Sequence, residues 1–215
     1  EGSPQPIGSD HGAVLVQNGE IYNQSELRSR CNTYPWRTSG DSETILAMHR
    51  QGTSVDETPR DNPADDHANW VSALDGMWGF AIWDSRRREL LLCRDSMGVK
   101  PLMRTLLPDG TLLFASEVKA FHAHPDFCLR PDIDALAVRL AYEYPLDMTT
   151  LFRDVTQVAP GTVESWSLDE QGRAVLNGVC RHSRNIVSPE GRWDPSVQAR
   201  ILLDSFREGL EARMM

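Results

Sequence analysis

The residues best suited to chemistry in this 215-residue chain are the triplet Asn18-Gly19-Glu20. The apolar run 13–16 in front of the triplet is typical of a buried strand, and an Asn-Gly pair favours a turn or a positive φ. The sequence therefore predicts that a side-chain amide, an exposed glycine N–H and a carboxylate gather where a strand ends. Such groups can stabilise a developing oxyanion and bind an α-amino group.

A second interpretation of the triplet requires no chemistry. The same residues fit a hairpin turn that leads into a helix, because Asn23 and Glu26 have the spacing of a capping box. The triplet by itself does not decide between a binding site and a turn.

Five segments in a fixed order extend the pattern beyond the triplet. They are NGEIYN (18–23), TSGDSETIL (38–46), LDGMWGFAIWD (74–84), LLLCRDSMGVKPL (90–102) and LLFASEVKAF (112–121). Together they closely resemble the glutamine amidotransferase domain of the asparagine synthetase family, which is of the class II, N-terminal-nucleophile type. LFRDVTQVAPGT (151–162) is similar to a later segment of that family, so the resemblance covers roughly residues 4–168.

The resemblance implies a role for each polar residue of the pattern. The Asn18 side-chain amide and the Gly19 N–H would form an oxyanion hole, and Glu20 and Asp41 would bind the α-amino group of glutamine. Asp41 also has a purely structural interpretation, since a carboxylate in the first turn of a helix stabilises it by about 0.3–1 kcal/mol. For the run containing Arg94 and Asp95 we expect an ion pair and a tight glycine turn.

Two departures from the family pattern concern catalysis. Family members carry a nucleophilic cysteine as the first residue of the mature chain, and its own α-amino group acts as the base. This sequence begins with Glu1, and its cysteines at 31, 93, 128 and 180 are internal. It also contains no SGG-x-DS loop of an ATP-pyrophosphatase domain. We therefore expect an N-terminally truncated, inactive amidotransferase domain with no cofactor of its own, and ATP and Mg only in a missing synthetase domain.

Two functions follow from the resemblance. In the first, the full-length protein hydrolyses glutamine and supplies ammonia for the ATP-dependent amidation of a carboxylate such as aspartate. In the second, the domain is a catalytically degenerate scaffold or binding module, as in β-lactam-synthetase-like relatives that lack the cysteine. The expected partners are glutamine and a synthetase domain or subunit, with a homo-oligomer as an option.

Composition and residue spacing argue against several other classes of protein. The net charge of −9 argues against a nucleic-acid-binding surface, and no apolar run approaches the ~18 residues that span a bilayer. The cysteine spacings fit neither a metal site nor a disulfide framework, which favours a cytoplasmic protein. His122 and His124 have no third ligand at useful spacing, so no metal site is expected.

The periodicity of apolar residues predicts an α+β fold of mainly antiparallel strands. Strands are expected at 13–17, 77–83, 89–94, 101–106, 111–115, 162–168 and 173–176. Helices are expected at 24–31, at 43–50 with Gly40 as its cap, at 116–121 with Ser116 as its cap, at 131–143 and from 194 onward. The strand at 77–83 is apolar on both faces and must be covered on both, which with the resemblance implies a four-layer αββα sandwich.

The expected domain limits follow from the same pattern. Residues 1–176 would form the amidotransferase-like domain, and the acidic segment 51–69 would be a mobile insertion loop because it has almost no apolar positions. Residues 177–215 would be a linker and a C-terminal helix that lead toward the synthetase domain.

Overall fold

A computed structural model describes residues 4–53, 62–182 and 194–214 of the chain. The helices are α1 (Gln24–Arg30), α2 (Ser42–Gly52), α3 (Asp65–Ser72), the 3₁₀-helix η1 (Val118–Ala123), α4 (Ile133–Tyr142) and α5 (Pro195–Arg213). The strands are β1 (Ile7–Gly8), β2 (Ala13–Ile21), β3 (Gly76–Asp84), β4 (Glu89–Arg94), β5 (Met103–Leu106), β6 (Leu112–Ala115), β7 (Val155–Gln157), β8 (Thr162–Leu168) and β9 (Ala174–Arg181).

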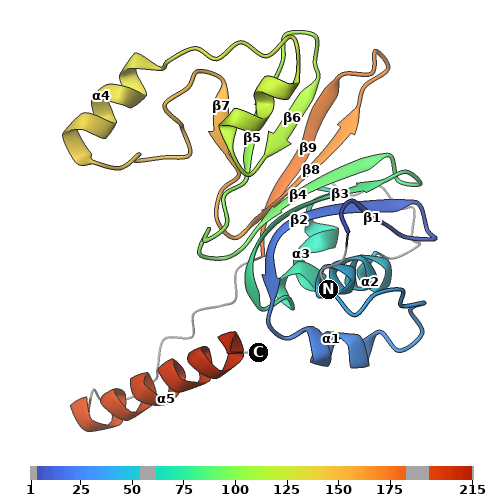
Figure 1. The fold of residues 1–215 in the computed structure, drawn as a ribbon, viewed down its shortest axis with the longest axis vertical. Coiled ribbons are helices and arrows are strands. Elements are labelled where there is room, and N and C mark those ends of the chain that lie inside the picture. Colours follow the sequence, from blue (N-terminus) through green and yellow to red (C-terminus); the bar gives the residue numbers. More distant parts are fainter. Residues whose placement is uncertain (1–3, 54–61, 183–193, 215) are drawn as a thin grey trace.

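The strands form two antiparallel sheets that are stacked on one another. The larger sheet has the order β1-β2-β3-β4-β8-β9, and the smaller has the order β6-β5-β7. Helices α1, α2 and α3 cover one face of the larger sheet, and the smaller sheet lies on the other side (Figure 1). None of the helices in the described part of the chain is long and apolar enough to cross a membrane.

Each face of β3 packs into a different apolar core, as its sequence predicts. Trp78, Phe80 and Ile82 belong to the core between the larger sheet and the helices. Ala81 belongs to a second core between the two sheets, together with Leu102 and other side chains. The two-sheet α+β sandwich is therefore built around β3, which is buried on both sides.

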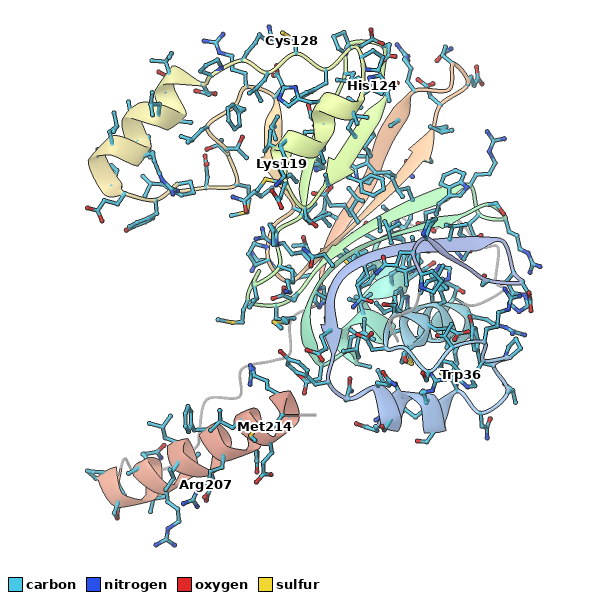
Figure 2. All side chains as sticks on the ribbon, viewed as in Figure 1. Trp36, Lys119, His124, Cys128, Arg207 and Met214 are labelled. Atoms are coloured by element: carbon cyan, nitrogen blue, oxygen red, sulfur yellow. The ribbon has the colours of Figure 1, made fainter. Side chains whose placement is uncertain are left out.

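The outer helices are less buried than their apolar patterns predict. Neither α4 nor α5 contains a buried residue, and Ile133 and Leu140 of α4 are 62% and 77% exposed. In Figure 2 the side chains of α5 project into solvent around most of the helix. In Figure 1, η1 lies against the smaller sheet, whereas α4 extends away from it.

Part of the predicted insertion loop at 51–69 is helical, so that prediction was wrong. Residues 51 and 52 close α2, and α3 begins at Asp65, while 54–61 lie outside the described residues. The pattern was misleading because His67 is a polar residue that is fully buried, next to buried Trp70 and Val71. Asp65 and Asp66 fit the first turn of α3, where carboxylates are favoured.

Two predicted strands end elsewhere in the structure, and two short strands were not predicted. β2 continues through the Asn-Gly pair to Ile21 because β3 pairs with it along its whole length. β9 is longer than the predicted strand 173–176 and crosses the predicted domain limit at 176, although the division into domains itself stays a prediction. The two shortest strands, β1 and β7, have no clear signal in the sequence.

The caps predicted at residues 23, 40 and 116 are absent from the structure. Asn23 occupies the N-cap of α1 without capping it, and its amide bonds instead to the backbone of Ala73 and Asp75, at 2.9 Å each. Asp41, not Gly40, is the N-cap residue of α2, and its side chain does not cap the helix either. Ser116 precedes a 3₁₀-helix rather than capping an α-helix.

Arg94 and Asp95 do not pair with each other as expected. Asp95 is buried and accepts hydrogen bonds from four backbone N–H groups, those of Trp78, Met97, Val99 and Lys100. Arg94 donates to the carbonyl oxygens of Gly98, Lys100 and Val158 and to the side chain of Gln157. The expected glycine turn is present, since Gly98 has a φ of +64°. The two side chains therefore hold the loop 95–101 through its backbone.

A buried polar network joins α2 and α3 to the larger sheet on its helical face. Trp70 Nε1 donates to His67 Nδ1 at 3.2 Å, so the proton of His67 is on Nε2, which lies 3.2 Å from Glu89 Oε2. Ser165 Oγ donates to the other oxygen of Glu89 at 2.6 Å, and Arg87 Nε donates to Oε2 at 2.9 Å. Burial raises the pKa of Glu89, but the interactions with His67, Ser165 and Arg87 outweigh it and bring the pKa to about 2.

His49 makes this network sensitive to acid. Its ring stacks on that of His67, and its Nε2 lies 3.8 Å from Asp84 Oδ2. The charges of Glu89 and Arg87 also affect the pKa of His49. Burial, helped by His67, lowers the pKa of His49 to about 4. The unfolded chain therefore binds a proton at His49 near pH 6.5, whereas the folded chain does so only near pH 4.

We predict that the free energy of unfolding falls by roughly 2 kcal/mol between pH 7 and pH 5 because of His49 alone. Urea denaturation of the wild type and of His49→Gln across this range measures the effect. The variant has no imidazole to protonate, so its stability should depend less on pH, even if it is less stable at pH 7. Parallel pH profiles for the two proteins would contradict the assignment.

Candidate functional site

The triplet Asn18-Gly19-Glu20 lies in the last part of β2, beside a cavity between the two sheets. The cavity has a volume of about 150 Å³ and is lined by Val16, Gln17, Asn18, Gly79, Phe80, Ala81, Leu102, Phe114, Ala115 and Ser116. Asn18 Nδ2 donates to Ser116 Oγ at 3.1 Å. Because side chains alternate along a strand, Glu20 lies on the same face of β2 as Asn18, and its side chain is exposed.

Gly19 is required by the close approach of β2 to β3. Its φ is +145°, and a Cβ atom on this residue would lie 2.1 Å from Met77 O and 2.6 Å from Trp78 Cα. A side chain at this position therefore meets backbone atoms, which cannot move aside cheaply. The positive φ expected of the Asn-Gly pair is present, although the strand does not turn there.

The Gly19 N–H points to the open edge of β2, away from β3. Residue 19 is paired with Trp78, whose own N–H and C=O bond to Asp95 on the opposite side, at 3.3 and 2.8 Å. In an antiparallel ladder, two residues paired in this way both direct their backbone groups outward. The amide nitrogens of Gln17 and Ile21 confirm the alternation, because both bond to side chains outside the sheet.

Two side chains occupy the open edge on either side of Gly19. The Gln5 amide accepts from Gln17 N at 2.6 Å and donates to Gln17 O at 2.9 Å, so it replaces a strand residue. Asp41 Oδ2 accepts from Ile21 N at 2.8 Å. The Gly19 N–H therefore lies between an amide and a carboxylate on the same edge.

Asp41 is brought to β2 by the start of α2 and the loop before it. Glu43 is buried and accepts from the backbone N–H of Arg37 at 2.9 Å and of Thr38 at 2.6 Å, which fixes this loop. Arg28 donates to Thr38 O at 2.6 Å from the other side. Since Ile21 follows Glu20 directly, two carboxylates reach the same end of β2, and together they favour a cation.

None of the four cysteines belongs to this site. Cys31 Sγ lies 3.1 Å from Gln51 Oε1, Cys180 Sγ lies 2.9 Å from Ala64 O, and Cys93 is fully buried in β4. Burial raises the pKa of all three thiols, which keeps them protonated. Cys128 is exposed on the loop between η1 and α4, near the upper edge in Figure 2. The described chain thus places no thiol in the cavity.

Sequence patterns did not indicate two of the residues that shape the site. Gln5 lies between two prolines, and nothing in the sequence pattern shows that its side chain reaches Gln17. Ser116 has the sequence context of a helix cap, and its partner Asn18 is 98 residues away. His122 and His124 were not expected to bind a metal, and no group of three potential ligands occurs in the part of the chain that the structure describes.

A family model described as a glutamine amidotransferase domain matches residues 1–175. The chain belongs to this family. The amidotransferase domain is 30% identical over 175 residues to asparagine synthetase [glutamine-hydrolyzing] 3 of Bacillus subtilis, covering 79% of this chain and 26% of that protein. It is 36% identical over 155 residues to a putative asparagine synthetase [glutamine-hydrolyzing] of Mycobacterium bovis, covering 69% of this chain and 21% of that protein. The match therefore spans about a quarter or less of each relative.

Comparison with solved structures confirms the fold of the amidotransferase domain. The glutamine phosphoribosylpyrophosphate amidotransferase of Bacillus subtilis superposes with a TM-score of 0.53 at 21% identity, over 85% of this chain and 32% of that chain. The predicted Ntn-hydrolase-like sandwich is thus correct. The predicted relationship to glutamine-hydrolysing asparagine synthetases is also confirmed for the region of the domain.

We predict that Gly19→Ala destabilises the domain by about 2–4 kcal/mol, because it adds overpacking against the β3 backbone to an unfavourable φ. Urea denaturation measures the loss. Gly172→Ala is a matched control, since Gly172 has a φ of +77° but nothing within 4 Å of an added Cβ. It should lose only about 1 kcal/mol. Equal losses in the two variants would show that β2 and β3 are not in close contact at Gly19.

Proposed function

We propose that this domain binds glutamine at the open edge of β2. The Asn18 amide and the Gly19 N–H contact the side-chain carbonyl oxygen of glutamine, and Glu20 and Asp41 contact its α-ammonium group. Donors and carboxylates are arranged in the order that such a ligand needs, since glutamine has an acceptor at one end and a cation at the other.

The observation that carries this proposal is the hydrogen bond between Asp41 Oδ2 and Ile21 N. It brings the start of α2 to the end of the strand that holds the triplet, although the two segments are separate in the sequence. If Asp41 served only its own helix, its side chain would cap α2, and it does not. This hydrogen bond supports a contact between the Asp41 carboxylate and a ligand bound at Gly19.

For the whole protein we propose hydrolysis of glutamine to glutamate and ammonia in the cytoplasm. The ammonia would serve the ATP-dependent amidation of a carboxylate such as aspartate. We place the ATP and magnesium of that step on a synthetase domain or subunit, and assign no cofactor to this chain. The donors at Asn18 and Gly19 would stabilise the tetrahedral intermediate, and removing one such donor typically costs roughly 10²–10³ in rate.

A second candidate is a domain that binds glutamine without hydrolysing it. The placement of the cysteines favours it, because Cys31, Cys93 and Cys180 are buried and Cys128 is on the outer loop. Hydrolysis and binding share the same contacts to glutamine, so they differ only in whether a nucleophile reaches the side-chain amide of the bound glutamine.

We predict that Asp41→Asn weakens glutamine binding by at least about tenfold, because it removes a charge that faces the α-ammonium group. The asparagine oxygen can still accept from Ile21 N, so the stability should change little. Titration of each protein with glutamine by calorimetry or NMR measures the affinity. Asp204→Asn is the control, because Asp204 is an exposed carboxylate on α5. Equal affinity of Asp41→Asn and the wild type would contradict the assignment.

We predict that the 215-residue polypeptide does not hydrolyse glutamine, since none of its cysteines lies in the cavity. Glutamate release during incubation with glutamine measures the activity. A variant with all four cysteines replaced by alanine serves as the control and should match the background rate. Turnover that persists in this variant would show that the mechanism does not use a thiol.

A further inference from the structure

We infer that Ser116 is a positioning residue for Asn18, and that its hydroxyl holds the side-chain amide in place at the glutamine site. The inference rests on the proposed function, in which the Asn18 amino group donates to the side-chain oxygen of glutamine. It assigns to Ser116 a role that acts through Asn18 and not through contact with the substrate.

The hydrogen bond between Asn18 and Ser116 connects the two sheets. Ser116 follows β6 of the smaller sheet, and Asn18 belongs to β2 of the larger sheet, with Nδ2 3.1 Å from Oγ. The position of Ser116 is set by the register of β6 on β5, in which Ala115 pairs with Met103. Among the residues that line the cavity, Ser116 is the only one with a hydroxyl group.

An asparagine amide needs such a partner because nothing in its own covalent structure holds the terminal torsion of the side chain. The Nδ2 group donates two hydrogen bonds and Oδ1 only accepts, while the terminal torsion of the side chain is broad and roughly two-fold. With one N–H directed to Ser116 Oγ, the second N–H is available to an oxygen in the cavity. The Ser116 hydroxyl can also donate to Oδ1, so it restrains the torsion of the side chain, and the acceptor oxygen of glutamine selects the orientation in which Nδ2 donates.

A fixed Asn18 amide would stabilise the bound ligand better than a mobile one. Donors that already point to the position of an oxyanion need no reorganisation when the charge develops. The Gly19 N–H is fixed by the backbone ladder, whereas the Asn18 amide is a side chain and is fixed only by what it contacts. Ser116 Oγ is its hydrogen-bond partner in the described structure.

A purely structural role makes a different prediction. If Ser116 only braces the two sheets, then Ser116→Ala lowers stability and leaves glutamine affinity unchanged. If Ser116 positions Asn18, the same variant weakens glutamine binding, and the weakening disappears when Asn18 is already replaced. A double-mutant cycle therefore separates the two roles.

The test is a glutamine titration followed by NMR on ¹⁵N-labelled wild type, Ser116→Ala, Asn18→Ala and the double variant. Ser116→Ala should weaken binding about fivefold in the wild-type background and less than about twofold in the Asn18→Ala background. The Asn18 side-chain amide resonances should shift in Ser116→Ala and recover in Ser116→Thr, which keeps the hydroxyl. Ser167→Ala is the control, because its hydroxyl bonds to Asn177 on an exposed part of β8 and β9.

Each other outcome overturns the inference in a recognisable way. Equal weakening in both backgrounds, or unchanged affinity of Ser116→Ala, shows that Ser116 does not act through Asn18. Unchanged Asn18 amide resonances in Ser116→Ala show that the hydrogen bond does not hold the amide in place. Absence of glutamine binding by the wild type instead overturns the proposed function, and with it any positioning role for Ser116.

Discussion

β2 and β3 pair without a break from Ala13 and Asp84 to Ile21 and Gly76, and this ladder decides how every group at the candidate site points. Side chains at even positions of β2 face the smaller sheet, so Asn18 reaches the cavity. Backbone groups of residues 17, 19 and 21 face outward, so the edge can receive Gln5 and Asp41. A slip of one residue would exchange both sets, so that the Asn18 side chain would face the helices and the Gly19 N–H would face β3.

The two faces of the larger sheet carry different polar groups. On the helical face, His67, Glu89 and their partners form a buried polar network that contributes to stability and makes it depend on pH. On the other face, the cavity holds Asn18 and Ser116 in contact with the smaller sheet. The network and the cavity lie on opposite faces of the larger sheet, so the pH dependence predicted for His49 originates on the face away from Asn18.

Much of the larger sheet could be predicted from the sequence, because its long strands have clear apolar patterns. Asn18, Gly19 and Glu20 could be selected because an amide, a glycine and a carboxylate stand together after an apolar run. What could not be predicted were contacts between distant side chains. Ser116 resembled a helix cap, since a serine before a helical segment usually is one. The sequence of α3 resembled that of a loop, because His67 and two aspartates made it polar. His67 is nevertheless buried, and a hydrogen bond from Trp70 satisfies its ring.

Side chains occupy part of the open edge of β2, and this limits which molecules can pair with the strand. An unpaired strand edge normally recruits further strands, from another chain or from a peptide, through a row of free backbone groups. Here the Gln5 amide occupies both groups of residue 17, and Asp41 occupies the N–H of residue 21. What is left around Gly19 is too short to template a strand. The occupied groups leave no row of backbone partners for an extended polypeptide, which protects this edge from edge-to-edge aggregation.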